Sequence, residues 1–109
     1  MATRSRKTAF DAAREQVVAA VRDVLSRKPY RDTWEETDGS HFESVIDPGW
    51  CWIPLPMSVD ITETDARVFV RATNRTAWFM VGGAFQYRCL GEFFKAVKKQ
   101  LAQARSGRP

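Results

Sequence analysis

The chain has 109 residues, of which 44% are hydrophobic, with 17 Lys and Arg against 13 Asp and Glu. This length suits one domain with a hydrophobic core, and the composition argues against a disordered chain. No apolar run approaches the roughly 20 residues of a membrane-spanning helix, and no signal-type segment follows the basic N-terminus. We therefore expect a cytoplasmic protein without a membrane partner. Two cysteines, Cys51 and Cys89, are too few for a disulfide framework and are expected to be buried thiols.

The N-terminal part of the chain predicts a tail followed by a helix. Residues 1–7 are small, polar and basic, which predicts a disordered tail. Apolar side chains then recur at helical spacing, Thr8 is a candidate N-cap and Pro29 a stop. These features predict a helix over residues 8–27. Arg14 falls within its apolar arc, where we expect the side chain to extend along the edge of the core.

Short segments between turn residues predict antiparallel strands in the middle of the chain. Asp38-Gly39 predicts a hairpin between residues 33–37 and 40–46. Pro48-Gly49 favours a turn before a strand at residues 50–53. The prolines of the following Pro-Leu-Pro segment favour an edge or a crossing loop rather than a central strand.

The second half of the chain predicts another hairpin and a C-terminal helix. Residues 67–73 and 76–81 form the clearest strand pair, joined by Asn74-Arg75, and residues 84–88 are a candidate last strand. An apolar arc predicts a helix over residues 90–105. The fold class is therefore α+β, with an N-terminal helix, an antiparallel meander of five to seven strands and a C-terminal helix packed on the sheet. One domain over residues 8–105 is expected, followed by a disordered tail at 106–109.

Charge is sorted into blocks along the chain. Nine acidic side chains and no basic one lie from Asp32 to Asp65, whereas nine basic side chains and a single acid, Glu92, follow from Arg67 onward. Residues 1–31 carry eight basic and three acidic side chains. This segregation predicts a dipolar or self-complementary surface, and it is informative about partners rather than about catalysis.

The hairpin expected at Asn74-Arg75 would sort its side chains onto two faces. Counting outward from the turn makes one face apolar, namely Val68, Val70, Ala72, Ala77, Phe79 and Val81, and Val59 and Ile61 extend it. The other face would present Arg67, Phe69, Arg71, Trp78 and Met80, with Arg71 opposite Trp78.

Arginines interleaved with aromatic rings bind single-stranded nucleic acid, because bases stack on the rings and the guanidinium groups neutralise phosphates. Arg75 and the helix lysines Lys95, Lys98 and Lys99 could extend such a track. Two alternatives remain open. A helix or a second subunit could cover this face while its arginines pair with the acidic segment, or the face could bind a specific protein.

The acidic segment contains the only histidine. We interpret His41 and Glu43 as lying on opposite faces of a strand, so the sequence predicts no metal site and no cofactor. No carboxylate pair and no Ser-His or Cys-His pairing can be argued, which predicts a protein that is not an enzyme. A solvated acidic face is expected, with docking onto a basic partner as the alternative. Trp50 and Trp52 share a predicted face near Trp34, as core or as exposed interface anchors.

These observations favour a non-catalytic protein-interaction module, such as an adaptor, chaperone-like or inhibitor protein. It would bind another protein or a second copy of itself, as a homodimer, through a charge-polarised aromatic surface. The alternative is a module that binds single-stranded RNA or DNA, although the nine acids would repel phosphate wherever they face it. A third hypothesis is a small enzyme or ligand-binding protein with a pocket between sheet and helices.

Overall fold

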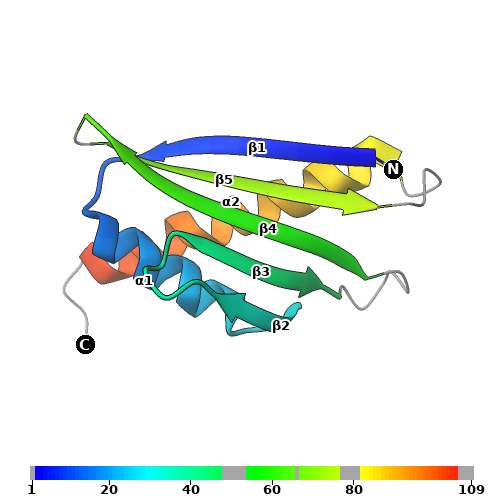
Figure 1. Ribbon diagram of the computed structural model, residues 1–109, viewed down its shortest axis with the longest axis horizontal. Coiled ribbons are helices and arrows are strands. Elements are labelled where there is room, and N and C mark those ends of the chain that lie inside the picture. The colour runs from blue at the N-terminus through cyan, green and yellow to red at the C-terminus, as the bar shows by residue number, and fades with distance from the viewer. Residues whose placement is uncertain (1, 48–53, 66, 77–81, 106–109) are drawn as a thin grey trace.

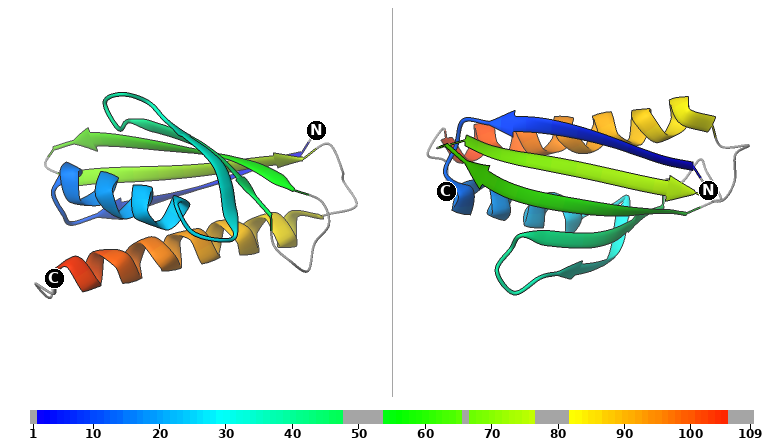
Figure 2. Two further views of the ribbon diagram at one scale, coloured as in Figure 1. Left: turned by 90° about the horizontal axis from the view of Figure 1, so that it is seen from below. Right: turned by 45° about the horizontal axis from the view of Figure 1, so that its top comes forward.

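A computed structural model describes residues 2–47, 54–65, 67–76 and 82–105 of the chain. The elements in chain order are β1 (Ala2–Phe10), α1 (Arg14–Leu25), β2 (Tyr30–Glu35), β3 (His41–Ile46), β4 (Leu55–Thr64), β5 (Arg67–Thr76) and α2 (Gly82–Arg105). The strands form one antiparallel sheet in the order β1-β5-β4-β3-β2, and both helices lie on the same side of it (Figures 1 and 2). The predicted α+β class, with a C-terminal helix on an antiparallel sheet, is confirmed.

The core lies between the helices and the inward-facing side chains of the sheet. The strands contribute alternate residues, among them the fully buried Phe42, Val59 and Val70. The helices contribute residues at helical spacing, such as Val17 on α1 and Phe93 on α2. Within the described residues, neither helix combines the length and the apolar character that a membrane crossing needs.

The segment predicted as a basic tail instead forms strand β1, which pairs with β5 from Ala2↔Thr76 to Phe10↔Val68. Its inward-facing arginines lie over aromatic rings of α2. The guanidinium carbon of Arg4 is 6.0 Å from the Tyr87 ring centroid, and that of Arg6 is 5.7 Å from the Phe94 centroid. A polar strand is therefore held by backbone pairing and by arginine stems packed on rings.

Helix α1 begins later than predicted because β1 occupies residues up to Phe10. Thr8 lies in β1 and does not cap the helix. The N-cap is Ala13, whose backbone N–H donates to the Gln16 side-chain oxygen at 3.3 Å. Arg14 is partly buried, and its guanidinium donates to the Asp38 backbone oxygen at 2.8 Å.

The predicted hairpin at Asn74-Arg75 is wrong, because β5 runs without interruption from Arg67 to Thr76. Residues 68–74 of this strand pair with β4 on one side and with β1 on the other. The candidate strand at residues 84–88 is also wrong, because these residues belong to α2, which begins at Gly82. The residues predicted to form the second hairpin strand, 77–81, lie outside the described residues.

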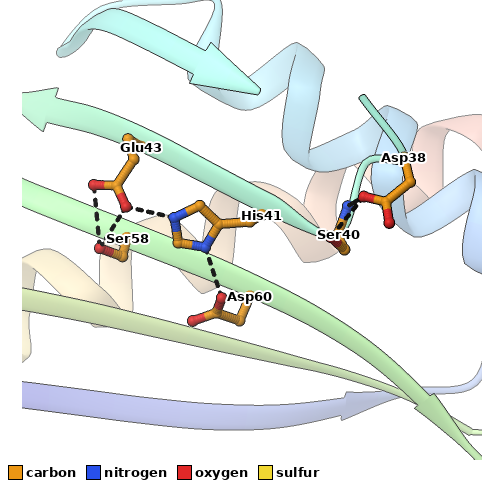
Figure 3. Close-up of polar contacts among 6 residues, drawn as sticks. All are labelled: Asp38, Ser40, His41, Glu43, Ser58 and Asp60. Atoms are coloured by element: carbon orange, nitrogen blue, oxygen red, sulfur yellow. Dashed lines mark hydrogen bonds and ion pairs between the residues drawn. The ribbon is translucent and has the colours of Figure 1, made fainter. Parts of the chain in front are cut away.

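The predicted β2–β3 hairpin is present, with a longer loop than the two residues expected. Gly39 has φ = 74°, a left-handed conformation that glycine adopts without steric cost. The Asp38 carboxylate accepts hydrogen bonds from the Ser40 backbone N–H at 2.9 Å and from its hydroxyl at 2.6 Å (Figure 3). These bonds lower the pKa of Asp38 and fix the turn locally.

The Pro-Leu-Pro segment leads into a central strand rather than along an edge. Pro56 is the second residue of β4 and pairs with Val45 of β3. Pairing of β4 with β5 begins one residue later, at Met57. At Pro56 the strand is thus paired on one side only, which explains how a residue without an N–H is accommodated.

Candidate functional site

The candidate site is the face of the sheet that points away from the helices, which no other described element covers (Figure 2). Alternate residues of each strand project from it, and direct cross-strand partners share it. This open face presents Thr3, Ser5, Lys7 and Ala9 of β1; Arg67, Phe69, Arg71, Thr73 and Arg75 of β5; Pro56, Ser58, Asp60, Thr62 and Thr64 of β4; His41, Glu43 and Val45 of β3; and Trp34 of β2. All of these side chains are exposed or partly exposed.

The half of the open face formed by β1 and β5 is basic. Lys7 lies beside Arg71 across the strand pair, and its ammonium is 4.7 Å from the centroid of the Phe69 ring. Arg67 and Arg75 lie further along β5. Among the described residues, the three arginines of β5 form no ion pair with a carboxylate. Their charge is therefore available to a binding partner.

The half formed by β4 and β3 is acidic and contains a cluster built around His41 (Figure 3). The Nδ1 atom of His41 is 2.7 Å from Oδ1 of Asp60, its direct partner on β4. The Nε2 atom contacts the carboxylate of Glu43, two residues along β3. The Ser58 hydroxyl donates to the Glu43 carboxylate, at 3.3 Å from Oε1 and 3.2 Å from Oε2, the oxygen that also contacts His41. One row of contacts thus joins β3 to β4 across the face.

The His41 ring makes both carboxylate contacts as a donor only when both nitrogens carry a proton. The hydrogen bond to Asp60, and then that to Glu43, raise the pKa of His41, and partial burial opposes them. The Trp34 ring approaches His41 edge to face, with centroids 6.3 Å apart, while 53% of Trp34 stays exposed. The acidic half therefore carries a protonatable group and an exposed indole.

The sequence interpretation that His41 and Glu43 point to opposite faces is wrong, because residues two apart on a strand share a face. Their proximity still does not create a metal site. The two carboxylates contact different nitrogens on opposite sides of the ring, so they flank it rather than converge on a point. No group of His, Cys, Asp or Glu suited to a metal ion occurs within the described part of the chain.

The cluster also differs from a Ser-His-Asp relay. The Ser58 hydroxyl faces a carboxylate and makes no contact with a ring nitrogen of His41, because both nitrogens are engaged by acids. Because each ring nitrogen faces a carboxylate, neither is placed to accept the proton of a serine. What the arrangement offers chemically is a charge pattern and hydrogen-bonding groups on an open surface.

The seam between the two halves runs between β4 and β5. Asp60 and Arg71 are direct cross-strand partners, so negative and positive charge meet there. Part of the acidic segment away from this face is paired internally. Arg22 of α1 forms two hydrogen bonds to Glu35, at 2.9 and 2.6 Å, and lowers its pKa. The carboxylates that remain on the open face belong to β3 and β4.

The structure unites some of the predicted binding residues and separates others. Arg67, Phe69 and Arg71 share the open face, as expected from their alternation with Val68, Val70 and Ala72, which are buried. Arg75, expected in a turn, lies on the same face of the continuous strand β5. The predicted extension to the lysines of the C-terminal helix does not form, because α2 covers the other face of the sheet (Figure 1). The predicted residues Trp50, Trp52, Trp78 and Met80 lie outside the described residues.

Sequence reasoning missed Lys7, Ser58 and Asp60 on this face. The position of Asp60 on the outer face could have been predicted, because it lies between Val59 and Ile61, which both point into the core. Lys7 carried no such signal, because β1 lacks an alternating apolar pattern. Comparison of the chain with protein-family models, with curated proteins and with solved structures gives no match in any of the three.

Proposed function

We propose that this chain is a non-catalytic protein-interaction module that binds a second copy of itself through the open face of the sheet. The observation that carries the proposal is the division of this face into a basic half on β1 and β5 and an acidic half on β4 and β3. Opposite charges placed side by side on one flat surface are suited to a partner with the same pattern reversed.

A second copy supplies that reversed pattern. In a twofold dimer both partners use the same patch. A twofold axis that runs parallel to the strands, near the seam between Asp60 and Arg71, brings each basic half over the partner's acidic half. Trp34, more than half exposed at the acidic side, would meet the basic half of the partner, where indole–cation contacts are favourable. Two sheets packed face to face are a common arrangement of antiparallel proteins.

Single-stranded nucleic acid is the second candidate, and the cations beside Phe69 favour it. Two features of the same face count against it. The Lys7 ammonium lies over the Phe69 ring, where a base would have to stack. Glu43 and Asp60 would repel a phosphate backbone that crosses the strands. The protein partner is therefore the stronger proposal.

A charge-swap experiment tests the dimer. We expect sedimentation velocity at low salt to detect a dimer that dissociates as salt is added. The basic-half variant Lys7→Glu/Arg71→Glu and the acidic-half variant Glu43→Lys/Asp60→Lys should each remain monomeric alone. An equimolar mixture of the two variants should associate again, because each then presents the charge that the other lacks.

The matched control changes charge elsewhere. Lys95→Glu/Lys98→Glu, on exposed positions of α2, alters net charge as the basic-half variant does and should leave the dimer intact. A wild-type chain that stays monomeric at low salt, or a mixture that fails to associate, overturns the proposal. Binding of a single-stranded oligonucleotide with a steep negative salt dependence, together with a monomeric chain, would favour the nucleic-acid alternative.

A further inference from the structure

A cavity of about 460 Å³ lies on the helix side of the sheet, on the opposite side from the open face. It is formed where the end of α1, the start of β2 and the middle of α2 meet. This volume falls in the range of small-molecule sites. The buried part of its lining is apolar and comes from three elements: Val24 of α1, Ile46 of β3 and Cys89 of α2. Ala96 of α2 and the half-buried ring of Tyr30 complete the apolar part.

The rim of the cavity is basic. Of the residues that the structure describes, four cationic side chains line it, namely Arg27, Lys28, Arg88 and Lys99, against the one carboxylate of Glu92. Arg27, just beyond the end of α1, is partly neutralised by Asp23 at 3.0 Å and also donates to Oε1 of Gln100 of α2 at 3.2 Å. In the described part of the chain neither Lys28 nor Lys99 forms an ion pair with a carboxylate.

Tyr30 adds a polar group to the apolar wall. Its ring packs edge to face on Phe93, with centroids 6.0 Å apart, which fixes its orientation. Burial raises the pKa of the Tyr30 hydroxyl well above its usual value, and the nearby Cys89 and Glu92 act in the same direction. Like any tyrosine hydroxyl in neutral solution, that of Tyr30 carries its proton and can donate a hydrogen bond to an acceptor.

We propose that this cavity binds an amphipathic organic anion. Its apolar body would lie against Val24, Ile46 and Ala96, and its carboxylate, sulfonate or phosphate group would lie at the rim between Lys28 and Lys99. Because cations outnumber carboxylates at the rim, the cavity should favour an anion over a cation. Because its lining is apolar, it should favour an anion with an organic body over an inorganic ion. The site lies on the helix side of the sheet and is independent of the dimer proposed above.

Titration calorimetry with anilinonaphthalene sulfonate, an aromatic anion, tests this site against its neutral analogue phenylnaphthylamine. We expect one anion to bind per chain, more tightly than the neutral compound. Lys28→Glu/Lys99→Glu should weaken anion binding by about tenfold or more, because two attractive charges become repulsive, and should leave binding of the neutral compound within about twofold. Both lysines are exposed, so the variant keeps the buried core unchanged.

The control variant Lys95→Glu/Lys98→Glu makes the same change of charge on α2, the helix that carries Lys99, at positions that do not line the cavity, and should leave both affinities within about twofold of wild type. Ala96→Phe should abolish binding of both compounds by filling the apolar part, and the smaller Ala96→Met makes the same test if the first variant does not fold. Equal loss of anion affinity in the two charge variants overturns the proposal. So does a neutral compound that binds as tightly as the anion.

Discussion

Asn74 of β5 and Gln86 of α2 bond to each other between the sheet and the helix. The Asn74 amide nitrogen donates to the Gln86 backbone oxygen at 3.1 Å, and the Gln86 amide nitrogen donates to Oδ1 of Asn74 at 3.1 Å. Both side chains are fully buried. Two polar residues are thus accommodated in an apolar layer, and each side-chain NH2 group has an acceptor on the other residue.

This pair predicts a non-additive effect of substitution. Asn74→Leu removes one partner and leaves the buried amide of Gln86 without its acceptor, which should lower the free energy of unfolding by about 1–3 kcal/mol. Gln86→Leu should act similarly. The double variant Asn74→Leu/Gln86→Leu should lose less than the sum, because no polar group then remains unsatisfied. Urea unfolding of the four proteins measures the coupling, and strictly additive losses would contradict it.

Gly39 is the second position where one substitution should be costly. A Cβ atom there would lie 2.8 Å from Cγ1 of the buried Val18, and φ is 74°. We expect Gly39→Ala to destabilise the protein by at least about 1 kcal/mol in urea unfolding. Gly91 of α2 is the control, because its Cβ would meet only the Arg6 guanidinium at 3.4 Å. Gly91→Ala should be neutral or stabilising, by up to about 1 kcal/mol; equal losses at both glycines would be unexpected.

The pH dependence of stability should report the His41 cluster. The folded state raises the pKa of His41 through Asp60 and Glu43, so it binds a proton more tightly than the unfolded chain does. The resulting stabilisation is fully present below the unfolded value of about 6.5 and is lost as pH rises through the folded pKa. The unfolding free energy of wild type should therefore fall above about pH 6.5.

His41→Gln should flatten this decline, because the titrating group is gone. Asp60→Asn should shift the His41 resonances in an NMR titration to a lower pKa, since the leading contact becomes uncharged. A wild-type midpoint at or below the ordinary histidine value would show that the cluster does not stabilise the imidazolium in solution.

Strand β1 should be required for stability in spite of its polar sequence. Deletion of residues 2–9 removes its pairing with β5 and exposes the edge of that strand, which carries Val68, Val70 and Ala72. We expect a lower urea midpoint and aggregation that increases with protein concentration. An unchanged midpoint would mean that the segment behaves as the tail that its composition predicts.

The sequence was most informative about features that depend on residues close together in the chain. The apolar stripe of residues 17–25 predicted the buried side of α1, and Val59, Ile61, Val68 and Val70 predicted the inward face of β4 and β5. The Asp38-Gly39 turn was likewise visible, since its geometry depends on a glycine and on side chains a few residues away. Each of these predictions needed only neighbouring residues.

The candidate site was predicted in part. Counting outward from the expected turn at Asn74-Arg75 placed Arg67, Phe69 and Arg71 on one face, and their alternation with the valines of β5 holds although that turn is absent. Their neighbours were not predicted, because the expected partner strand was residues 76–81, whereas β1 and β4 are the actual partners. Which strands adjoin is set by long-range pairing, and it decides which charges lie side by side.

The chain by itself therefore determined the α+β class, the apolar faces of its helices and strands, and the segregation of charge. Tertiary structure alone decided that a polar basic segment becomes β1, that Asn74 is a buried strand residue and not a turn, and that Asp60 lies beside Arg71. The reason is physical. Periodicity and turn propensity act over a few residues, whereas strand pairing and a buried amide pair depend on partners that are remote in sequence.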